Sequence, residues 1–109
     1  MFKKTERVNR EQFETFFRIG RRYHSPYATI VYTSYPTFHA SVVVSKKVNK
    51  KAVTRNTLRR RIYGQLYSLK KEERTGVFMV ILKPAFKQLT RDAGRGHVAA
   101  LIERITKPA

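Results

Sequence analysis

The longest unbroken run of apolar residues in this 109-residue chain is only six residues long, at residues 77–82 (VFMVIL). A helix that crosses a bilayer needs about 20 apolar residues, so no segment of the chain is expected to span a membrane. The run does not alternate between apolar and polar residues, which is typical of a central strand that is covered on both faces. We therefore expect a layered fold in which this strand lies inside the core.

A short helix is expected near the N-terminus of the chain. Asn9 can cap it with Gln12 reaching back to the cap, and Gly20 stands where its C-terminal cap belongs. Aromatic side chains recur at the spacing of a single helical face, and these are Phe13, Phe16 and Phe17. Before this helix, residues 1–8 are expected to form a loose basic arm.

Two extended segments follow this helix. Residues 23–33 are rich in Tyr, Thr, Ile and Val, and a turn at residues 34–37 leads into a second run that ends near residue 45. Two adjacent antiparallel strands are the expected structure, with room for a short third strand. In the second run one face is expected to lie in the core, and it consists of Phe38, Ala40, Val42 and Val44.

The second half of the chain is expected to contain two helices around the apolar strand. From about residue 52 a narrow apolar stripe is formed by Leu58, Ile62, Leu66 and Leu69. A last helix is expected over residues 90–106 behind a Thr90 cap. Gly94 and Gly96 each cost about 1 kcal/mol inside a helix, which would allow a start nearer His97. The chain is thus expected to be one α+β domain over residues 1–109.

The charge of the chain points to an anionic partner. There are 24 Lys and Arg residues against 7 Asp and Glu residues, so the net charge is +17. This charge repels itself in the compact state, which is typical of proteins that bind a polyanion or an anionic surface. Residues 46–61 contain eight of the basic residues and no acid, whereas a merely solvated helix usually interleaves Glu with Lys. We therefore predict a face that binds a phosphate backbone, because guanidinium groups hold phosphate oxygens bidentately.

Other kinds of site are poorly supported by the sequence. There is no cysteine, which excludes disulfides, thiolate zinc sites and a catalytic thiol. The three histidines are far apart, and the acids do not form the converging carboxylates that a two-metal nuclease needs. No Gly-rich phosphate loop or nucleophile motif is present. We therefore predict no catalytic residue and no metal site in the polypeptide, and no secretion signal, which places it in the cytoplasm.

At this point the chain resembles the protein subunit of bacterial ribonuclease P. The resemblance is carried by residues 45–48 (SKKV), 52–56 (AVTRN) and 58–61 (LRRR). These segments combine a strand end, a basic loop and an Arg-Asn pair that is followed by more basic residues on a helix. The similarity extends to residues 7–8 and 13–17 before the motif and to residues 83–85 after it, so it covers nearly the whole chain.

The resemblance implies a fold of three helices and one four-stranded mixed sheet, with a left-handed crossover around the Arg-Asn helix. It also implies two RNA-binding sites. The site for the catalytic RNA subunit would consist of Lys46, Lys47, Lys50, Lys51, Arg55, Asn56, Arg59, Arg60 and Arg61. The site for the single-stranded 5′ leader of precursor tRNA would lie between the first helix and the sheet, and would consist of Phe13, Phe17 and Tyr32.

Two positions depart from the family pattern. Thr57 follows the Arg-Asn pair where a further basic residue is common, and Arg61 is the residue that could replace its contact. Many members have Gly after the strand-end Val, whereas this chain has Asn49 followed by Lys50 and Lys51. Asn tolerates a left-handed backbone better than most residues, so we expect the loop still to turn at this point.

The function that the resemblance implies is to assist a catalytic RNA in removing the 5′ leader from precursor tRNA. The chemistry would belong to the RNA and its Mg²⁺ ions, and the partners would be the RNA subunit and precursor tRNA, without an obligatory protein partner. Two other interpretations stay open at this point. One is a structural ribosomal protein, which has the same size and charge. The other is a self-sufficient nuclease, which would need carboxylates that the sequence does not bring together.

Overall fold

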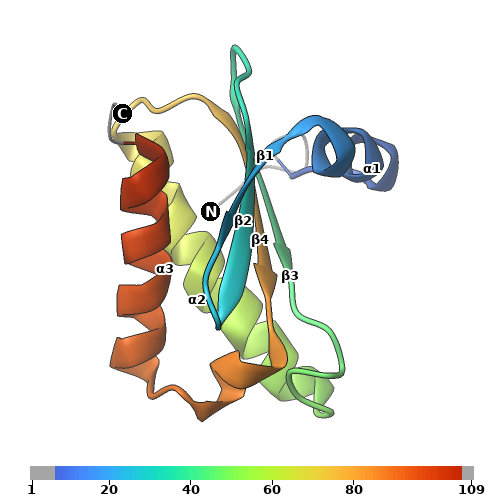
Figure 1. Cartoon of the computed structure of the whole chain (residues 1–109), viewed down its shortest axis with the longest axis vertical. Helices are drawn as coiled ribbons and strands as arrows, with labels where there is room; N and C mark the ends of the chain where they lie inside the picture. The colour runs from blue at the N-terminus through green and yellow to red at the C-terminus, as the bar shows by residue number, and fades with distance from the viewer. Residues whose placement is uncertain (1–6, 107–109) are drawn as a thin grey trace.

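The computed structural model describes residues 7–106, which form three α-helices and a four-stranded mixed sheet (Figure 1). Along the chain the elements are α1 (Arg10–Ile19), β1 (Arg21–His24), β2 (Ala28–Thr33), β3 (Phe38–Val43), α2 (Ala52–Lys71), β4 (Gly76–Leu82), the short 3₁₀ helix η2 (Pro84–Gln88) and α3 (Arg91–Thr106). The α+β class and the helix and strand content expected from the sequence and the resemblance are confirmed. No helix in the described range has the length and apolar character needed to cross a membrane.

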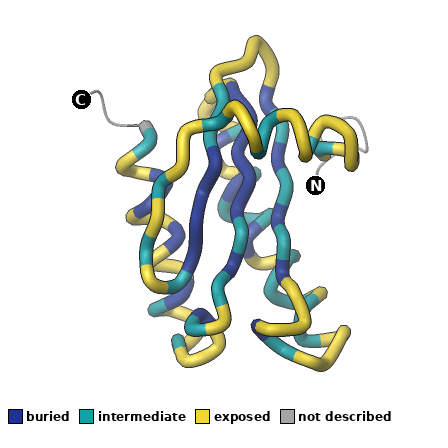
Figure 2. Tube along the Cα trace, turned by 45° about the vertical axis from the view of Figure 1, so that its right-hand side comes forward, coloured by how far each residue is buried: buried dark blue, intermediate teal, exposed yellow. Residues whose placement is uncertain are grey.

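Helices cover both faces of the sheet. Helices α2 and α3 pack on one face, and α1 lies across the other (Figure 1). The larger core lies under α2 and α3, and its centre is fully buried at Ile30, Leu66 and Val80. The smaller core lies under α1 around Val31 and Met79. Burial is concentrated along the strands, as Figure 2 shows.

Strand order is the main difference from the sequence-based expectation. The predicted pairing of the two extended runs as adjacent antiparallel strands is wrong, because the sheet order is β1-β2-β4-β3 and β4 lies between them. β4 is antiparallel to β2 and parallel to β3. As the most apolar strand, β4 gains most from a central position where both faces are buried. The β3-α2-β4 connection is the expected crossover between parallel strands, and its handedness remains a prediction.

The first extended run is divided into two strands that form a hairpin. β1 and β2 pair in antiparallel register from Arg21 opposite Tyr32 to His24 opposite Thr29. Between them, the hydroxyl of Ser25 accepts hydrogen bonds from the backbone N–H groups of Tyr27 and Ala28 at 3.2 and 3.1 Å. Because this turn reverses the chain, β1 forms beside β2 as the short third strand for which the sequence left room.

The helix ends follow the capping signals. Both hydrogen bonds of the predicted Asn9–Gln12 capping box are present. At α3, the hydroxyl of Thr90 accepts from the N–H of Ala93 at 3.2 Å, and the helix begins at Arg91 rather than near His97. Gly94 is tolerated because a Cβ there would lie 2.9 Å from Cζ of Phe86, so the ring uses the space that glycine leaves.

The start of the described chain is attached to the sheet edge. The N–H of Val8 donates to the carbonyl of Ala40 on β3 at 3.1 Å, and Arg7 forms an isolated parallel bridge with the same residue. The Arg7 guanidinium lies 5.3 Å from the ring centre of Tyr63 on α2. The predicted loose arm therefore does not include Arg7 and Val8, and its residues 1–6 lie outside the described residues.

Candidate nucleic-acid interface

The basic loop at residues 45–51 is held in a defined shape by its own backbone. The carbonyl of Ser45 accepts from the N–H of Val48 at 3.1 Å, and Val48 is fully buried. The side-chain oxygen of Asn49 accepts from the N–H of Lys51 at 2.9 Å, which closes a local turn. The loop turns as expected but without a left-handed Asn49, because Glu73 is the one non-glycine residue in the described range with a positive φ. The side-chain bond makes the turn instead.

Arg55 joins this loop to α2. One of its guanidinium nitrogens donates to the carbonyl oxygens of Asn49 and Lys50, at 3.1 and 2.8 Å. The side chain is half-buried in this position. Arg55 therefore has a structural role within the predicted RNA-subunit site, and its remaining N–H donors can still face a phosphate.

The predicted RNA-subunit site occupies two sides of α2. Helical spacing puts Asn56, Arg59 and Arg60 on the same side of α2 as Tyr63, whose hydroxyl bonds to β3. The Asn56 side chain accepts a hydrogen bond from Arg59. Arg61 lies on the opposite side of the apolar stripe, where it lines a cavity with Leu58. Arg61 therefore lies across the apolar stripe from the Asn56 side, in a cavity that Asn49 of the basic loop also lines, so the predicted site is divided between two sides of α2.

Thr57 has no charge with which to contact a phosphate, in contrast to the basic residue that is common at this position in the family. Its hydroxyl donates to the carbonyl of Val53 at 3.0 Å within the helix. Arg61 follows one turn later, roughly 40° away around the helix axis, so it is placed on the side of α2 that Thr57 leaves without charge.

The positive charge of this surface is not neutralised by the protein. Within residues 7–106, none of the basic side chains at positions 46–61 forms an ion pair with an acid, and the ion pair that is present joins Arg74 to Glu72 at 3.8 Å in the turn after α2. Unpaired, largely exposed cations attract phosphate at long range. The surface is therefore available for an anionic partner.

The aromatic side of α1 forms a small platform above the sheet. The rings of Phe13 and Phe17 are stacked with centres 5.7 Å apart and planes inclined by 19°. Both are half-buried against the core around Val31. The guanidinium of Arg22 lies 4.4 Å from the centre of the Phe17 ring and donates to the Phe17 carbonyl at 3.0 Å. Arg22 was not predicted as a site residue, and the short connection from α1 into β1 brings it onto the Phe17 ring.

Tyr32 does not lie on this platform. Its ring packs 5.0 Å from that of Phe78, on the face of the sheet that α2 and α3 cover. Side chains alternate along a strand, and Val31 faces α1, so Tyr32 faces away. The predicted grouping of Tyr32 with Phe13 and Phe17 is therefore wrong. Along β2, Tyr32 alternates with Thr29 and Thr33 and shares a face with Ala28 and Ile30, so the strand pattern could have separated it from the platform.

The described residues do not offer a metal centre of their own. Within residues 7–106, no three His, Cys, Asp or Glu side chains are grouped so that they could hold an ion. The surface chemistry consists of cations, an aromatic platform and backbone groups. This combination suits binding of a nucleic acid.

Comparisons with known proteins agree with this geometry. The family model described as Ribonuclease P matches residues 2–106. A ribonuclease P protein component from Pseudanabaena sp. (strain PCC 6903) is 33% identical over 92 residues, which cover 76% of this chain and 79% of that protein. One from Rickettsia canadensis is 37% identical over 68 residues, and the match covers 53% of this chain and only 57% of that protein.

Solved structures show the same fold at low sequence identity. A mutant RNase P protein from Staphylococcus aureus, described as defective in mRNA degradation activity, superposes with a TM-score of 0.84 at 20% identity, covering 94% of this chain and 89% of that one. The RNase P protein of Staphylococcus aureus at 2.0 Å gives a TM-score of 0.80 at 18% identity, covering 94% and 97%. With the family model spanning nearly the whole sequence, the chain belongs to the ribonuclease P protein family.

Proposed function

We propose that this chain is the protein subunit that assists a catalytic RNA in removing the 5′ leader from precursor tRNA. The reaction is hydrolysis of one phosphodiester bond, which leaves a 5′ phosphate on the mature tRNA. The single observation that carries the proposal is the unpaired cationic surface of the loop at residues 45–51 and the Asn56 side of α2, in a chain of this family.

The cationic surface would bind the RNA subunit. Lys and Arg side chains that contact phosphates release condensed counterions, which favours binding at low salt. Neutralising the RNA backbone also lowers the repulsion between the catalytic RNA and the precursor tRNA. Arg55 supports this surface by fixing the loop on the helix.

The α1 platform would hold the leader. Single strands bind by stacking bases on aromatic rings beside cations, and each stacked base contributes roughly 1–3 kcal/mol. Phe13 and Phe17 supply the rings and Arg22 supplies the cation. A mature tRNA has no leader, so this contact would make the complex prefer precursor over product.

The Mg²⁺ ions that the resemblance implies do not fit a site on this chain. Mg²⁺ is bound through carboxylate oxygens and phosphates, and the described residues bring no cluster of carboxylates together. We propose that the ions belong to the RNA, and no step of the reaction is assigned to a protein side chain.

The test is reconstitution of cleavage with the matching RNA subunit at physiological Mg²⁺. The protein should increase cleavage of precursor tRNA, and the increase should grow with leader length until the platform is filled. Arg59→Ala with Arg60→Ala should weaken the effect, whereas the control Lys71→Ala with Arg74→Ala removes the same charge outside the site. A protein that does not improve cleavage but sediments with ribosomal subunits after a high-salt wash would be a ribosomal protein instead.

A further inference from the structure

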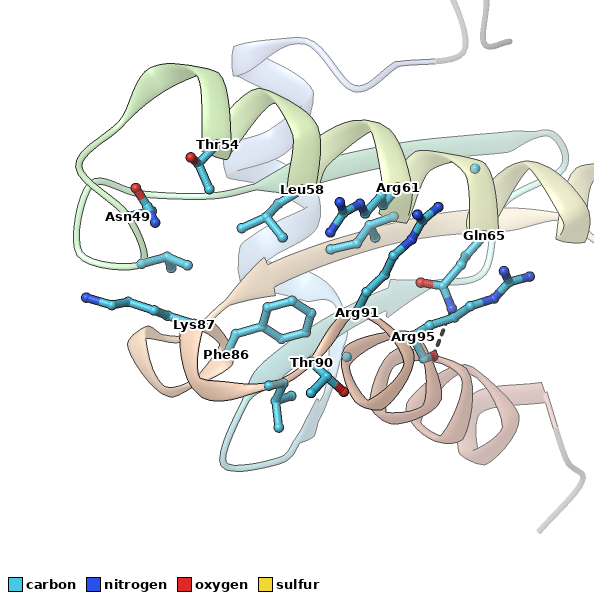
Figure 3. Close-up of a pocket in the computed structure, with 15 residues that line it drawn as sticks. Asn49, Thr54, Leu58, Arg61, Gln65, Phe86, Lys87, Thr90, Arg91 and Arg95 are labelled. Atoms are coloured by element: carbon cyan, nitrogen blue, oxygen red, sulfur yellow. Dashed lines mark hydrogen bonds between the residues drawn. The ribbon is translucent and has the colours of Figure 1, made fainter.

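A further set of cations surrounds a cavity on the other side of α2 from Asn56, and of these cations only Arg61 belongs to a predicted RNA-binding site. The cavity lies between α2, η2 and the N-terminal part of α3, and its volume is about 270 Å³ (Figure 3). This is close to the lower end of the roughly 300–1,000 Å³ that small-molecule sites occupy. Its size suits one aromatic ring system with its substituents.

The floor of the cavity is apolar. Leu58 and Ile62 line it from α2, and Phe86 and Leu89 line it from η2 and the residue that follows. The ring of Phe86 points into the middle of the cavity in Figure 3 and is itself buried. Because Gly94 has no side chain, the Phe86 ring can lie close to the backbone of α3 at this position. A flat apolar ligand would therefore find an aromatic and aliphatic floor.

The wall of the cavity is cationic and carries no acid. Four basic residues from three elements line it, namely Arg61, Lys87, Arg91 and Arg95. All four are exposed, and within residues 7–106 no hydrogen bond or ion pair involves the side chain of any of them. Gln65 donates from its side-chain amide to the carbonyl of Arg95 at 2.9 Å, which ties the arginines of α3 to α2. Unengaged guanidinium groups held beside a cavity are suited to a phosphate.

We propose that this cavity binds one unstacked nucleotide, with the base on the Leu58–Phe86 floor and the phosphate at Arg61, Arg91 and Arg95. A purely apolar ligand would leave the cations unused, and inorganic phosphate would leave the floor empty, whereas a nucleotide uses both. Val48 and Asn49 of the basic loop line the same cavity, so a strand bound on that loop could place a nucleotide in it. The assignment of this nucleotide to a bound RNA strand rests on the proposed function.

The test is titration of the full chain, labelled with ¹⁵N, by AMP, ribose 5-phosphate and adenosine in separate experiments. AMP should saturate and shift the amide signals of Leu58, Gln65 and Gly94. Ribose 5-phosphate should bind about tenfold more weakly, because it lacks the stacking base. Equal affinity for AMP and ribose 5-phosphate, or shifts confined to other surfaces, would overturn the proposal and leave a general anion site.

Two double variants test whether AMP binds at the cavity or is attracted by the positive charge of the protein in general. Arg91→Ala with Arg95→Ala should lower AMP affinity about tenfold or more, because two charged donors are removed. Lys71→Ala with Arg74→Ala removes the same charge elsewhere and should leave AMP affinity unchanged. A two-dimensional ¹⁵N spectrum of each variant checks that it is folded. Equal AMP affinity in both double variants would contradict the proposal.

The source of the nucleotide is tested by competition. A single-stranded RNA pentamer should displace AMP, and the same pentamer with an abasic central position should displace it about tenfold less well. AMP binding that the intact pentamer does not displace would overturn the assignment to an RNA strand. Because these titrations need no catalytic RNA, their result is independent of the cleavage assay that tests the proposed function.

Discussion

The hydroxyl of Tyr63 on α2 accepts a hydrogen bond from the backbone N–H of Val42 on β3, at 3.2 Å. Val42 lies on the strand at the edge of the sheet, where an outward N–H would otherwise have no partner in the ladder. This bond adds to the apolar packing of Ile62 and Leu66 in holding α2 against the sheet. The cationic surface is therefore positioned by the core rather than by its own charges.

Tyr63→Phe should lower the free energy of unfolding by about 1–3 kcal/mol, because it leaves the Val42 N–H unsatisfied in a partly buried place. Urea unfolding followed by circular dichroism measures the change. Tyr35→Phe is the matched control, because the Tyr35 hydroxyl is exposed and makes no hydrogen bond within the described residues. Equal stability of the two variants would show that the Tyr63 bond contributes nothing.

Arg55→Lys should loosen the loop at residues 45–51 while keeping the charge. An ammonium group on a flexible stem does not reproduce the planar guanidinium that reaches both the Asn49 and Lys50 carbonyls. Amide hydrogen exchange at Val48 and Lys51 should become faster, and RNA-subunit affinity should fall although the net charge is unchanged. Arg60→Lys also keeps the charge and is the control for the hydrogen-exchange measurement, since the Arg60 side chain makes no bond to the loop. Unchanged exchange in the Arg55 variant would contradict this role.

The two glycines of α3 should respond in opposite directions to alanine. Gly96 has open space around a built Cβ, so Gly96→Ala should stabilise the protein by up to about 1 kcal/mol through helix propensity. Gly94→Ala places a methyl group 2.9 Å from Cζ of the buried Phe86, so the steric cost should exceed the same propensity gain. Thermal unfolding of the pair gives the comparison directly. An equal gain in both variants would show that Phe86 moves freely.

Phe17→Leu should reduce the advantage of precursor tRNA over mature tRNA, because leucine keeps apolar contact with the Val31 core but lacks a flat ring for stacking. The expected loss in leader-dependent affinity is roughly 1–3 kcal/mol per base no longer stacked. Tyr32→Phe should leave leader-dependent affinity unchanged, since Tyr32 lies on the other face of the sheet. A thermal melt of each variant separates loss of binding from loss of folding. A leader effect in the Tyr32 variant would show that the face assignment does not govern binding.

The sequence predicted correctly those structural features that are set by residues close together in the chain, and it failed where residues distant in the chain decide the structure. The Asn9–Gln12 cap, the Thr90 cap and the buried face of β3 are set by residues a few positions apart, and all three are confirmed. The insertion of β4 between β2 and β3 depends on contacts that are distant in sequence, and there the preference for pairing sequential strands gave the wrong order.

The same contrast applies to the candidate sites. The run of cations at residues 46–61 is visible in the sequence, but its division between two sides of α2 depends on where the core lies. Arg91 and Arg95 line the same cavity as Arg61 only because α3 packs on α2. In the sequence they resemble ordinary exposed charges, and no local pattern connects them to Phe86.

Arg59→Ala with Arg60→Ala should weaken binding of the RNA subunit and make it less dependent on salt. Each duplex phosphate contact that is lost should reduce the slope of log affinity against log salt concentration by about 0.9. The measurement is filter binding of the labelled RNA subunit over a range of salt concentrations. Lys71→Ala with Arg74→Ala has the same net charge as this variant, so it separates a local contact from a general loss of attraction. If both double variants show the same slope, bulk charge rather than the Asn56 side of α2 binds the RNA. A difference confined to the Arg59 and Arg60 variant would locate the phosphate contacts on that side of the helix.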